Sequence, residues 1–420
     1  MTKIERVALL HSKRDYLYLF ITFALLLSFS LLHEYYNYKK LTKFDSQLIE
    51  ASVLKQYKKN KHQILKLKSS DGFSFYTTAP IRAPSYKGKD LQMEIWAGNI
   101  TFLEYLKGFF AFSKILQIKK SDTTTTKFAT AIAKQHTSHE TTAIYEALFL
   151  AKPLPYHLQQ VFSNLGISHL LAISGFHLSV LSAILFFLIK YPYEVLQKRF
   201  FPYRSAKRDS FALISLLLFS YMIFLDMPAS LLRSFSMLLL AFILYDKGIK
   251  IISMQTLLLT ALFLVALFPR LLFSLGFFLS LSGVFYIFLF LHYFENKSKV
   301  WQFLFLPFWE YLMMLPYSLI IFGNFSLYHP LSILLTSLFT LFYPLSIFLH
   351  LIGLGDLLDG AINFLINLDP HAIKFYFPTY LLSTEVLLSF LAIFKKEALY
   401  LLLVYNLSMF IYSIYHIAQL

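Results

Sequence analysis

The chain contains no cysteine, and that absence removes several classes of function at once. Disulfide frameworks, zinc fingers and thiol catalysis all depend on the missing side chain. No Gly-x-x-x-x-Gly-Lys-Ser/Thr pattern occurs, so the sequence does not encode a Walker A phosphate loop. A His-x-His-x-Asp-His metal cluster is absent as well. We therefore expect no metal site, no cofactor and no enzymatic activity in this chain.

Charged residues are also scarce, at 15% of the chain, whereas hydrophobic residues make up 57%. A soluble domain has roughly a quarter charged residues, so the composition indicates a membrane protein. Nine windows approach the roughly 20 apolar residues that cross about 30 Å of hydrocarbon. They are Tyr16–Leu32, Phe211–Leu225, Leu231–Tyr245, Thr256–Phe268, Leu271–His292, Phe303–Phe322, Leu331–Ile352, Tyr380–Phe394 and Leu399–Tyr415.

With the apolar segment 166–189, these windows predict an α-helical polytopic membrane protein of about 8–10 hydrophobic segments, some of them re-entrant. The composition divides the chain into four parts: 1–33, a cytoplasmic N-terminus and first transmembrane helix; 34–120, a basic extracytoplasmic β domain plus an amphipathic helix; 121–164, a linker and polar helices; and 165–420, the transmembrane domain.

The polar region opens with the two-residue alternation that is typical of strands. Leu65 and Leu67 alternate with polar residues before an Asp-Gly pair, and Phe73 and Phe75 alternate after it, which predicts a hairpin. A third alternating run follows at 91–95. We expect a small β domain of at least three strands, for which a five-stranded barrel of the OB type is one candidate.

Residues 101–116 change to helical spacing with a broad apolar face. This pattern predicts an amphipathic helix that lies in the membrane interface. Residues 127–163 have the pattern of polar-faced helices, interrupted at Pro153 and Pro155.

Lysine and arginine asymmetry predicts the topology of the chain. The segment 190–210 is expected to be a cytoplasmic loop because it carries six basic residues: Lys190, Lys198, Arg199, Arg204, Lys207 and Arg208. Counting back through the preceding segments places the β domain outside and the N-terminus in the cytoplasm. Simple crossings do not fit the C-terminal part, so a re-entrant element is expected within 331–379, broken at Pro330, Pro344 or Gly353-Leu354-Gly355.

The outer polar region is itself basic, since residues 34–127 contain 17 Lys and Arg against 8 Asp and Glu. Two interpretations remain open: a surface that binds a phosphate polymer, or a solvated lysine-rich face. Aromatic residues between the cations would stack bases in the first case and fill the domain core in the second. The candidate DNA-binding residues are Lys66, Lys68, Phe73, Phe75, Arg82, Lys87, Lys89 and Trp96.

The stretch GISHLLAISGFHLSVL at 166–181 places His169, Ser174, Gly175 and His177 in an apolar segment. On a straight helix the two histidines would lie about 12 Å apart along the axis. A break at Ser174-Gly175 would instead expose polar backbone, which is tolerated at membrane depth only where it is buried in protein or lines water. These residues predict a polar path, and the alternative is that they pack helices together.

A second polar site lies at 224–238, where Asp226 and Arg233 flank Pro228 between two apolar runs. Arg233 is a candidate phosphate contact. The alternative is that it extends to the interface or pairs with Asp226.

These stretches together resemble the ComEC family of competence proteins, the inner-membrane channel for DNA uptake in transformable bacteria. HLLAISGFHLSVL is similar to the most specific motif of that family, and MPASLLRSFSM is similar to its Ser-x-x-Arg segment at Ser230 and Arg233. LLFSLGFFLSLSGVF resembles a further family stretch, although Phe278 stands where the family has Gln. Residues 315–348 follow the Pro, Phe and Ser landmarks of the family.

The resemblance implies a channel that carries single-stranded DNA across the bacterial cell inner membrane into the cytoplasm during natural transformation. It implies a DNA path in the membrane formed by His169, Ser174, Gly175, His177, Asp226, Ser230 and Arg233. The implied partners are single-stranded DNA, membrane lipid, an extracytoplasmic DNA-delivery protein, and a cytoplasmic ATPase, helicase or strand-binding protein. The basic residues Lys198, Arg199, Arg204, Lys207 and Arg208 are expected to face that cytoplasmic partner.

Many family members carry a further metallo-β-lactamase-like nuclease domain, which this sequence lacks, so we expect conduction of one strand without hydrolysis of the other. Two other functions stay open. An intramembrane serine protease would use Ser174, although Ala172 stands where its motif has Gly, with His292, His329 or His350 as the base. A small-solute transporter would show inverted repeats. The sequence leaves the oligomeric state open.

Overall fold

The structure is a computed structural model that describes residues 13–419 except 60–61, 87, 120–123, 172, 226, 228, 248–252 and 369. It divides into two compact units. The first comprises residues 1–129, 246–250 and 258–277, and the second comprises 130–245, 251–257 and 278–420.

The first unit begins with the long helix α1 (Lys13–Leu41). Its residues 17–41 are apolar and long enough to cross a membrane. At 1.5 Å per residue these 25 residues extend for about 38 Å. The prediction of a first membrane-spanning helix is therefore confirmed in length and composition.

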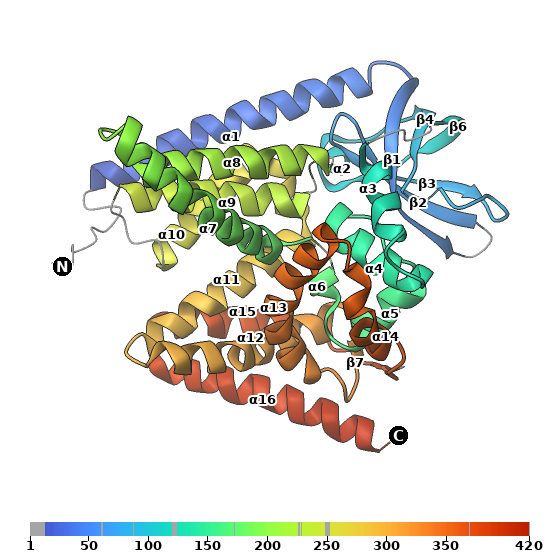
Figure 1. Cartoon of the computed structure of the whole chain (residues 1–420). Coiled ribbons are helices and arrows are strands. Elements are labelled where there is room, and N and C mark those ends of the chain that lie inside the picture. The colour runs from blue at the N-terminus through green and yellow to red at the C-terminus, as the bar shows by residue number, and fades with distance from the viewer. Residues whose placement is uncertain are drawn as a thin grey trace. The chain divides into compact units, whose positions relative to one another are not determined.

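The first unit also contains a small β barrel (Figure 1). Its strands are β1 (Ser46–Lys59), β2 (His62–Ser69), β3 (Ser74–Pro80), β4 (Asp90–Trp96), β5 (Phe109–Phe110) and β6 (Phe112–Lys119). β1 pairs antiparallel with β2 and β4, β2 pairs with β3, β3 runs parallel to β5, and β4 pairs with β6. Only Ala111 separates β5 from β6, so the two act as one strand and close a five-stranded barrel of the OB type.

The barrel core is built by the alternation that the sequence shows. Leu65, Leu67 and Phe75 are 0% exposed and Phe73 is 2% exposed, whereas the residues between them face outward. The predicted hairpin is present, because Leu67 lies opposite Phe75 across the turn that contains Gly72, whose φ is +87°.

The predicted amphipathic helix over 101–116 is wrong. Helix α2 covers only Phe102–Lys107, beginning at a capping box between Thr101 and Glu104. The hydrogen bonds that the Glu104 carboxylate accepts from Thr101 lower its pKa. Gly108 then adopts φ +98°, a conformation that ends the helix, and residues 109–119 continue as β5 and β6. Phe109 and Ala111 thereby enter the barrel core instead of a membrane interface.

Arg270 joins three stretches of the first unit. It lies in the short 3₁₀ helix η1 (Pro269–Phe273), and its Nη2 is 2.6 Å from Oε2 of Glu34 on α1. Its guanidinium also lies 4.7 Å from the ring centroid of Tyr105 on α2. Burial raises the pKa of Tyr105 to about 12, so this ring is neutral and keeps its attractive face for the cation.

The remaining elements are mainly helices. They are α3 (Thr124–Ala133), α4 (His139–Leu150), α5 (Tyr156–Asn164), α6 (Ser168–Leu171), α7 (Gly175–Phe200), α8 (Ala206–Phe224), α9 (Ala229–Asp246), α10 (Met254–Leu267), α11 (Leu275–Phe294), α12 (Lys299–Ile321), β7 (Asn324–Phe325), α13 (Leu331–Leu351), the 3₁₀ helix η2 (Gly355–Leu358), α14 (Asp359–Ile366), β8 (Ile373–Lys374), α15 (Tyr380–Ala392) and α16 (Lys396–Ala418).

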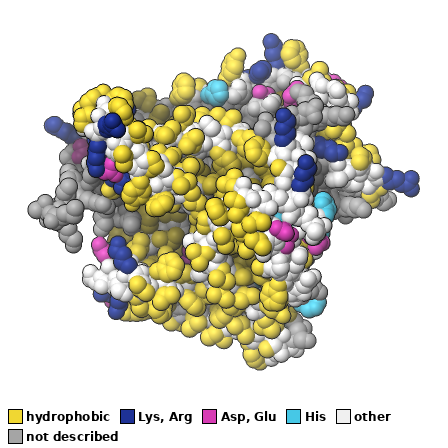
Figure 2. All heavy atoms as spheres, viewed as in Figure 1, with side chains coloured by type: hydrophobic (Ala, Val, Ile, Leu, Met, Phe, Trp, Pro, Cys, Tyr) yellow, Lys and Arg dark blue, Asp and Glu magenta, His cyan; other side chains and the backbone are white. Residues whose placement is uncertain are grey.

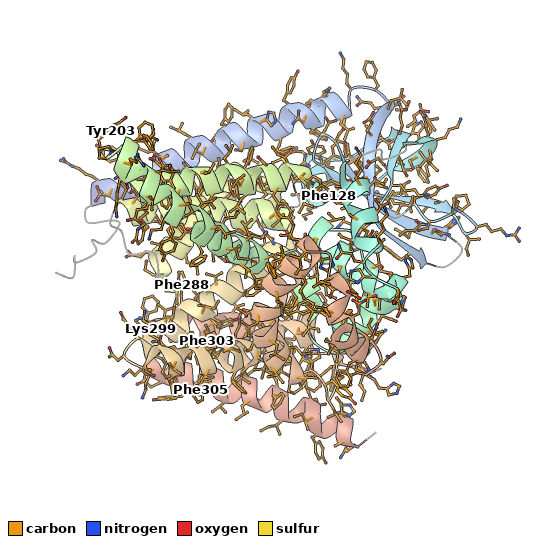
Figure 3. The ribbon with its side chains drawn as sticks, viewed as in Figure 1. Phe128, Tyr203, Phe288, Lys299, Phe303 and Phe305 are labelled. Carbon is orange, nitrogen blue, oxygen red and sulfur yellow. The ribbon has the colours of Figure 1, made fainter. Side chains whose placement is uncertain are left out.

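Among the described residues, five helices of the second unit are long and apolar enough to cross a membrane: α7, α11, α12, α13 and α16. Hydrophobic side chains cover much of the visible face of these helices (Figure 2). Phe303 and Phe305 of α12, which Figure 3 labels, are 67% and 48% exposed. Exposed apolar surface of this extent is what lipid requires, so the predicted fold class, a helical membrane protein with a small β domain, is confirmed.

Two of the apolar cores of the second unit join several of these helices to their neighbours. One is formed by α7, α8 and α9, with Leu178, Ile214 and Leu231 at its centre. The other joins α11, α12, α15 and α16 around Tyr286, Met313 and Leu402. Figure 1 shows α8 and α9 side by side, as the first core requires.

The predicted loop over 190–210 is mostly helical. Helix α7 continues through Pro192 to Phe200, and α8 starts at Ala206, so only residues 201–205 form the turn. A proline is tolerated within a membrane helix when neighbouring groups satisfy the freed carbonyl. Tyr203, in this turn, is 82% exposed and points away from the helices (Figure 3).

The chain departs from simple crossings after α13. Helix α13 runs without interruption through Pro344 and ends at Leu351. Gly353 adopts φ +81°, and the chain then forms η2 and the eight-residue α14. Of the expected break points, Gly353-Leu354-Gly355 is the one that interrupts the helices, and Pro330 precedes the first residue of α13.

Candidate functional site

The polar stretch singled out in the sequence forms a break between α6 and α7. Helix α6 ends at Leu171, α7 begins at Gly175, and Ser174 is extended with φ −128° and ψ 179°. The backbone N–H of Ser174 donates to Nδ1 of His177 over 3.2 Å, and the Ser174 hydroxyl lies 3.1 Å from the same nitrogen. Because Nδ1 accepts the backbone N–H, the imidazole proton of neutral His177 resides on Nε2.

His177 is fully buried, so it does not line a water-filled space in this structure. Its ring centroid lies 5.4 Å from that of Phe339 and 4.5 Å from that of Tyr343, both on α13. Its Nε2 has no hydrogen-bond partner within the described part of the chain. A buried donor without a partner costs about 1–3 kcal/mol. Other buried polar atoms of the unit, such as the hydroxyl oxygens of Tyr145 and Ser210, share this state.

Gly175 allows the start of α7 to approach α9 closely. A Cβ atom at this position would lie 2.8 Å from the Ser234 hydroxyl oxygen, so any larger residue would push the helices apart. Arg233, next to Ser234 on α9, is half-buried, and its buried Nε has no partner among the described residues. The site therefore combines two unsatisfied donors on α7 and α9. The Ser230 side chain and Asp226 lie outside the described residues.

His169 and His329 complete the surroundings of the break. His169, on α6, keeps solvent-exposed surface and interacts electrostatically with both His177 and His329. His329 is 5% exposed and packs against Gly166, where a Cβ would lie 3.2 Å from the imidazole Nδ1. Burial lowers the pKa of His329 to about 4. His329 is thus neutral near pH 7.

The geometry of Ser174 does not support the protease alternative. The nearest imidazole is His177, but its Nδ1 already accepts the Ser174 backbone N–H, and its Nε2 has no orienting carboxylate within the described residues. A nucleophile needs a free base and an accessible site. Of the three histidines expected as the base, His329 hydrogen-bonds with the backbone of Ser163, and Nδ1 of His350 lies 2.7 Å from the Ser346 carbonyl oxygen. The third, His292, is exposed in the last turn of α11.

A second buried polar cluster, which was not predicted from the sequence, lies among α11, α12, α15 and α16. Glu385 is 0% exposed, and its Oε1 accepts hydrogen bonds from the Tyr286 hydroxyl at 2.8 Å and from Asn406 Nδ2 at 3.2 Å. Ser389 Oγ lies 2.7 Å from the Tyr286 hydroxyl. Glu385 is the single carboxylate of the apolar helix α15, and the signal that would have found the cluster is the rarity of carboxylates in such segments.

The outer face of the barrel carries a row of cations and aromatic rings across four strands. Lys55 on β1 lies opposite Lys66 on β2, Lys66 lies opposite Tyr76 on β3, and Tyr76 lies opposite Phe110 on β5. The Lys66 ammonium lies 5.5 Å from the Tyr76 ring centroid. Like charges directly opposite each other destabilise a sheet, and an anionic ligand would remove that cost. The face formed by strands 2 and 3 is also where OB barrels bind oligonucleotides.

The residues predicted to bind DNA divide into three groups. Phe73 and Phe75 lie in the barrel core, so their rings cannot stack on bases and that prediction is wrong for them. Arg82, Lys89 and Trp96 are exposed, whereas Lys66 and Lys68 are half-buried on the outer face of β2. Lys87 lies outside the described residues. Lys55 and Phe110 were missed because their position depends on strand register.

The basic residues around 190–210 already have partners within the chain. Arg204 donates to both carboxylate oxygens of Asp209 at 2.8 Å, which raises the pKa of Arg204. Lys198 lies 3.1 Å from Glu194, and the Lys207 ammonium lies 3.4 Å from the Tyr245 ring centroid. Lys198 and Arg199 form the last turn of α7, and Lys207 and Arg208 lie in the first turn of α8.

Comparison with known proteins decides the family. A family model described as "Competence protein" matches residues 151–417, which is nearly two thirds of the chain. The chain belongs to the competence protein family. The matched range contains the break between α6 and α7 and the α9 segment with Arg233. Neither the curated proteins nor the solved structures contain a match to this chain. Membership in a competence family establishes a role in DNA uptake for transformation.

The lowered pKa of His329 predicts acid sensitivity. Its pKa is about 4 in the folded protein and about 6.5 in an unfolded chain. The unfolded state therefore binds the proton first, and stability falls by about 1.4 kcal/mol per pH unit between roughly 6 and 4. In thermal unfolding of the detergent-solubilised chain, the Tm of His329→Gln should fall less over this pH range than the Tm of the wild type. Parallel pH profiles for the two proteins would contradict the assignment.

Proposed function

We propose that this competence family member conducts a single DNA strand across the bacterial inner membrane into the cytoplasm. The observation that carries the proposal is the polar break between α6 and α7. Family membership supports the role in uptake, and the polar groups at the break support our assignment of the path that the strand takes. We assign no catalytic residue.

The groups around the break suit a phosphate backbone. Nε2 of His177 and Nε of Arg233 are donors that lack acceptors among the described residues. Hydrogen bonds from guanidinium groups to phosphate oxygens are stronger than neutral ones and are made by two N–H groups in parallel. Solvent-exposed His169 adds a weaker donor. A few weak contacts of this kind hold a strand without trapping it, as conduction requires.

The structure corresponds to a closed arrangement in this proposal. Phe339 and Tyr343 on α13 cover His177, so a passing strand requires α13 to shift away from α7. Aromatic side chains that close a polar constriction exclude water until they move. We infer that α13 is the mobile element of the conduit.

The barrel supplies the DNA-binding surface in this proposal. The row formed by Lys55, Lys66, Tyr76 and Phe110 offers two charges for phosphates and two rings for bases. Such a combination binds single strands without sequence preference. We place the barrel outside the cell and the N-terminus of α1 in the cytoplasm, on the basis of the lysine and arginine distribution.

The proposal implies partners on both sides of the membrane. An extracytoplasmic protein must deliver DNA, and a cytoplasmic ATPase, helicase or strand-binding protein must supply directional force because the sequence encodes no Walker A loop. We assign the cytoplasmic contact to the basic residues of the turns that flank residues 201–205, namely Lys198, Arg199, Lys207 and Arg208.

Uptake of labelled DNA tests the path through the membrane. In a deletion strain complemented with Arg233→Gln, we expect DNA to bind outside and its entry to fall by about tenfold or more, because a charge-assisted contact contributes about 1.5–3 kcal/mol. His169→Ala removes a weaker donor and should reduce entry by a smaller factor. The matched control is His292→Ala, which removes an exposed histidine at the end of α11. Normal entry in both path variants, with wild-type protein levels, would contradict the proposed path.

Salt dependence of DNA binding tests the barrel surface. The affinity of the purified full-length chain for an oligothymidylate should fall with salt, and the double variant Lys55→Gln/Lys66→Gln should reduce the log–log slope by about 1.4, or 0.7 per lost phosphate contact. Lys114→Gln is the control, since Lys114 lies opposite Glu94, which compensates its charge. An unchanged slope in the double variant would show that the row does not bind phosphates.

A further inference from the structure

Three segments of the second unit meet at a chain of ionisable groups that the proposed function does not use. His136 follows α3, His350 lies at the end of α13, and Asp359 is the first residue of α14. Nδ1 of His136 lies 3.0 and 3.1 Å from the two carboxylate oxygens of Asp359. Nε2 of His136 lies 3.0 Å from Nε2 of His350. The His136 side chain is 0% exposed and that of Asp359 is 14% exposed.

The hydrogen-bond partners fix the number of protons in this chain. Nδ1 of His350 lies 2.7 Å from the carbonyl oxygen of Ser346, which only accepts, so Nδ1 carries a proton. One proton lies between His136 Nδ1 and the Asp359 carboxylate, because two acceptors cannot form a hydrogen bond without a proton between them. If both rings were neutral, two lone pairs would face each other at 3.0 Å across the Nε2 atoms. A third proton is needed there, whichever of the three groups formally carries it.

We propose that Asp359, His136 and His350 form a proton-binding site that clamps the end of α13. With the third proton bound, the carboxylate and the two imidazoles are neutral as a group and joined by hydrogen bonds. Without it, the facing lone pairs repel and the clamp opens. The 3.0 Å separation of the Nε2 atoms matches an N–H···N hydrogen bond. A tetrahedral zinc ion with bonds of about 2.0–2.1 Å would place them about 3.3–3.4 Å apart.

The surroundings hold the two rings in place without competing for the proton. The ring of Tyr145 on α4 stacks on His136 at 4.5 Å and also lies 4.5 Å from His350. Gln135 bridges the same segments, since its Nε2 donates to the His350 carbonyl oxygen and its Oε1 accepts from the Gly355 N–H of η2. A Cβ at Gly355 would lie 2.9 Å from His350 Nε2, so only glycine leaves room for the ring.

The charged and titratable groups that face the pair are few. They are Asp359 from α14 and the neutral phenol of Tyr145 from α4, whose pKa is raised by burial. Asp356 of η2, Lys134 and His139 are exposed to solvent. The described residues contain no group of three or more side chains that could hold a metal ion. Asp359 is therefore the group that favours the bound proton.

The proton site determines the sign of a pH effect. Loss of this proton leaves the two Nε2 lone pairs facing each other, so the clamp is complete at acidic pH and opens as the pH rises through a midpoint. Hydrogen exchange of the full-length chain, corrected for the intrinsic exchange rate, should show protection of residues 134–138 and 353–359 falling about tenfold per pH unit above the midpoint, as loss of one proton requires.

Two variants and a control test the assignment. In His350→Gln the side-chain amide donates to His136 Nε2, so the clamp needs no third proton and its protection should no longer depend on pH. In Asp359→Asn the midpoint should move to lower pH, because the charge that favours the proton is lost. His157→Gln removes a solvent-exposed histidine that pairs with Glu140 at 2.7 Å, and it should keep the wild-type profile.

The same pH profile in the wild type and His350→Gln would overturn the proposal, as would loss of protection on adding a chelator at acidic pH. These outcomes are independent of DNA uptake. They test the proton site alone, and the proposed DNA conduit does not depend on their result.

Discussion

A peptide group without a hydrogen-bond partner costs several kcal/mol in hydrocarbon, and the break between α6 and α7 is built around that constraint. The Ser174 N–H, freed where the helix is interrupted, is accepted by Nδ1 of His177. This one bond fixes the tautomer and orientation of the imidazole and leaves Nε2–H as a buried donor without a partner in the described part of the chain. The backbone requirement therefore places a polar donor where the proposed strand passes.

Helix α13 connects the two polar regions of the second unit. Its middle carries Phe339 and Tyr343, which cover His177, and its end carries His350, which contacts His136. The anchor at His350 and the covering rings of Phe339 and Tyr343 therefore lie on the same helix. The buried Glu385 cluster lies in a different set of helices and stabilises their packing through Tyr286 and Asn406. Helix α13 is therefore the element shared by the break at His177 and the site formed by His136 and His350.

Sequence periodicity predicted those features that depend on local alternation or on length. Leu65 and Phe75 enter the barrel core because every second residue of a strand faces inward, and the apolar windows became helices. The error at 101–116 arose because Gly108 ends α2 in a conformation that periodicity does not reveal. Contacts between distant segments, such as His136 with His350, could not be predicted because they lie 214 residues apart. The row formed by Lys55, Lys66, Tyr76 and Phe110 could not be predicted either, because the pairing of β1 with β2 shifts register between Val53 and Lys55.

The absence of native cysteine makes a direct test of water access to the break possible. A single cysteine at His169 should react with a membrane-impermeant thiol reagent in spheroplasts, because a thiolate forms only where water reaches it. Leu341→Cys, on an exposed apolar face of α13, should not react. A DNA strand arrested during uptake should protect His169→Cys. A cysteine at position 169 that stays unlabelled, or whose labelling is unchanged by arrested DNA, would contradict the account.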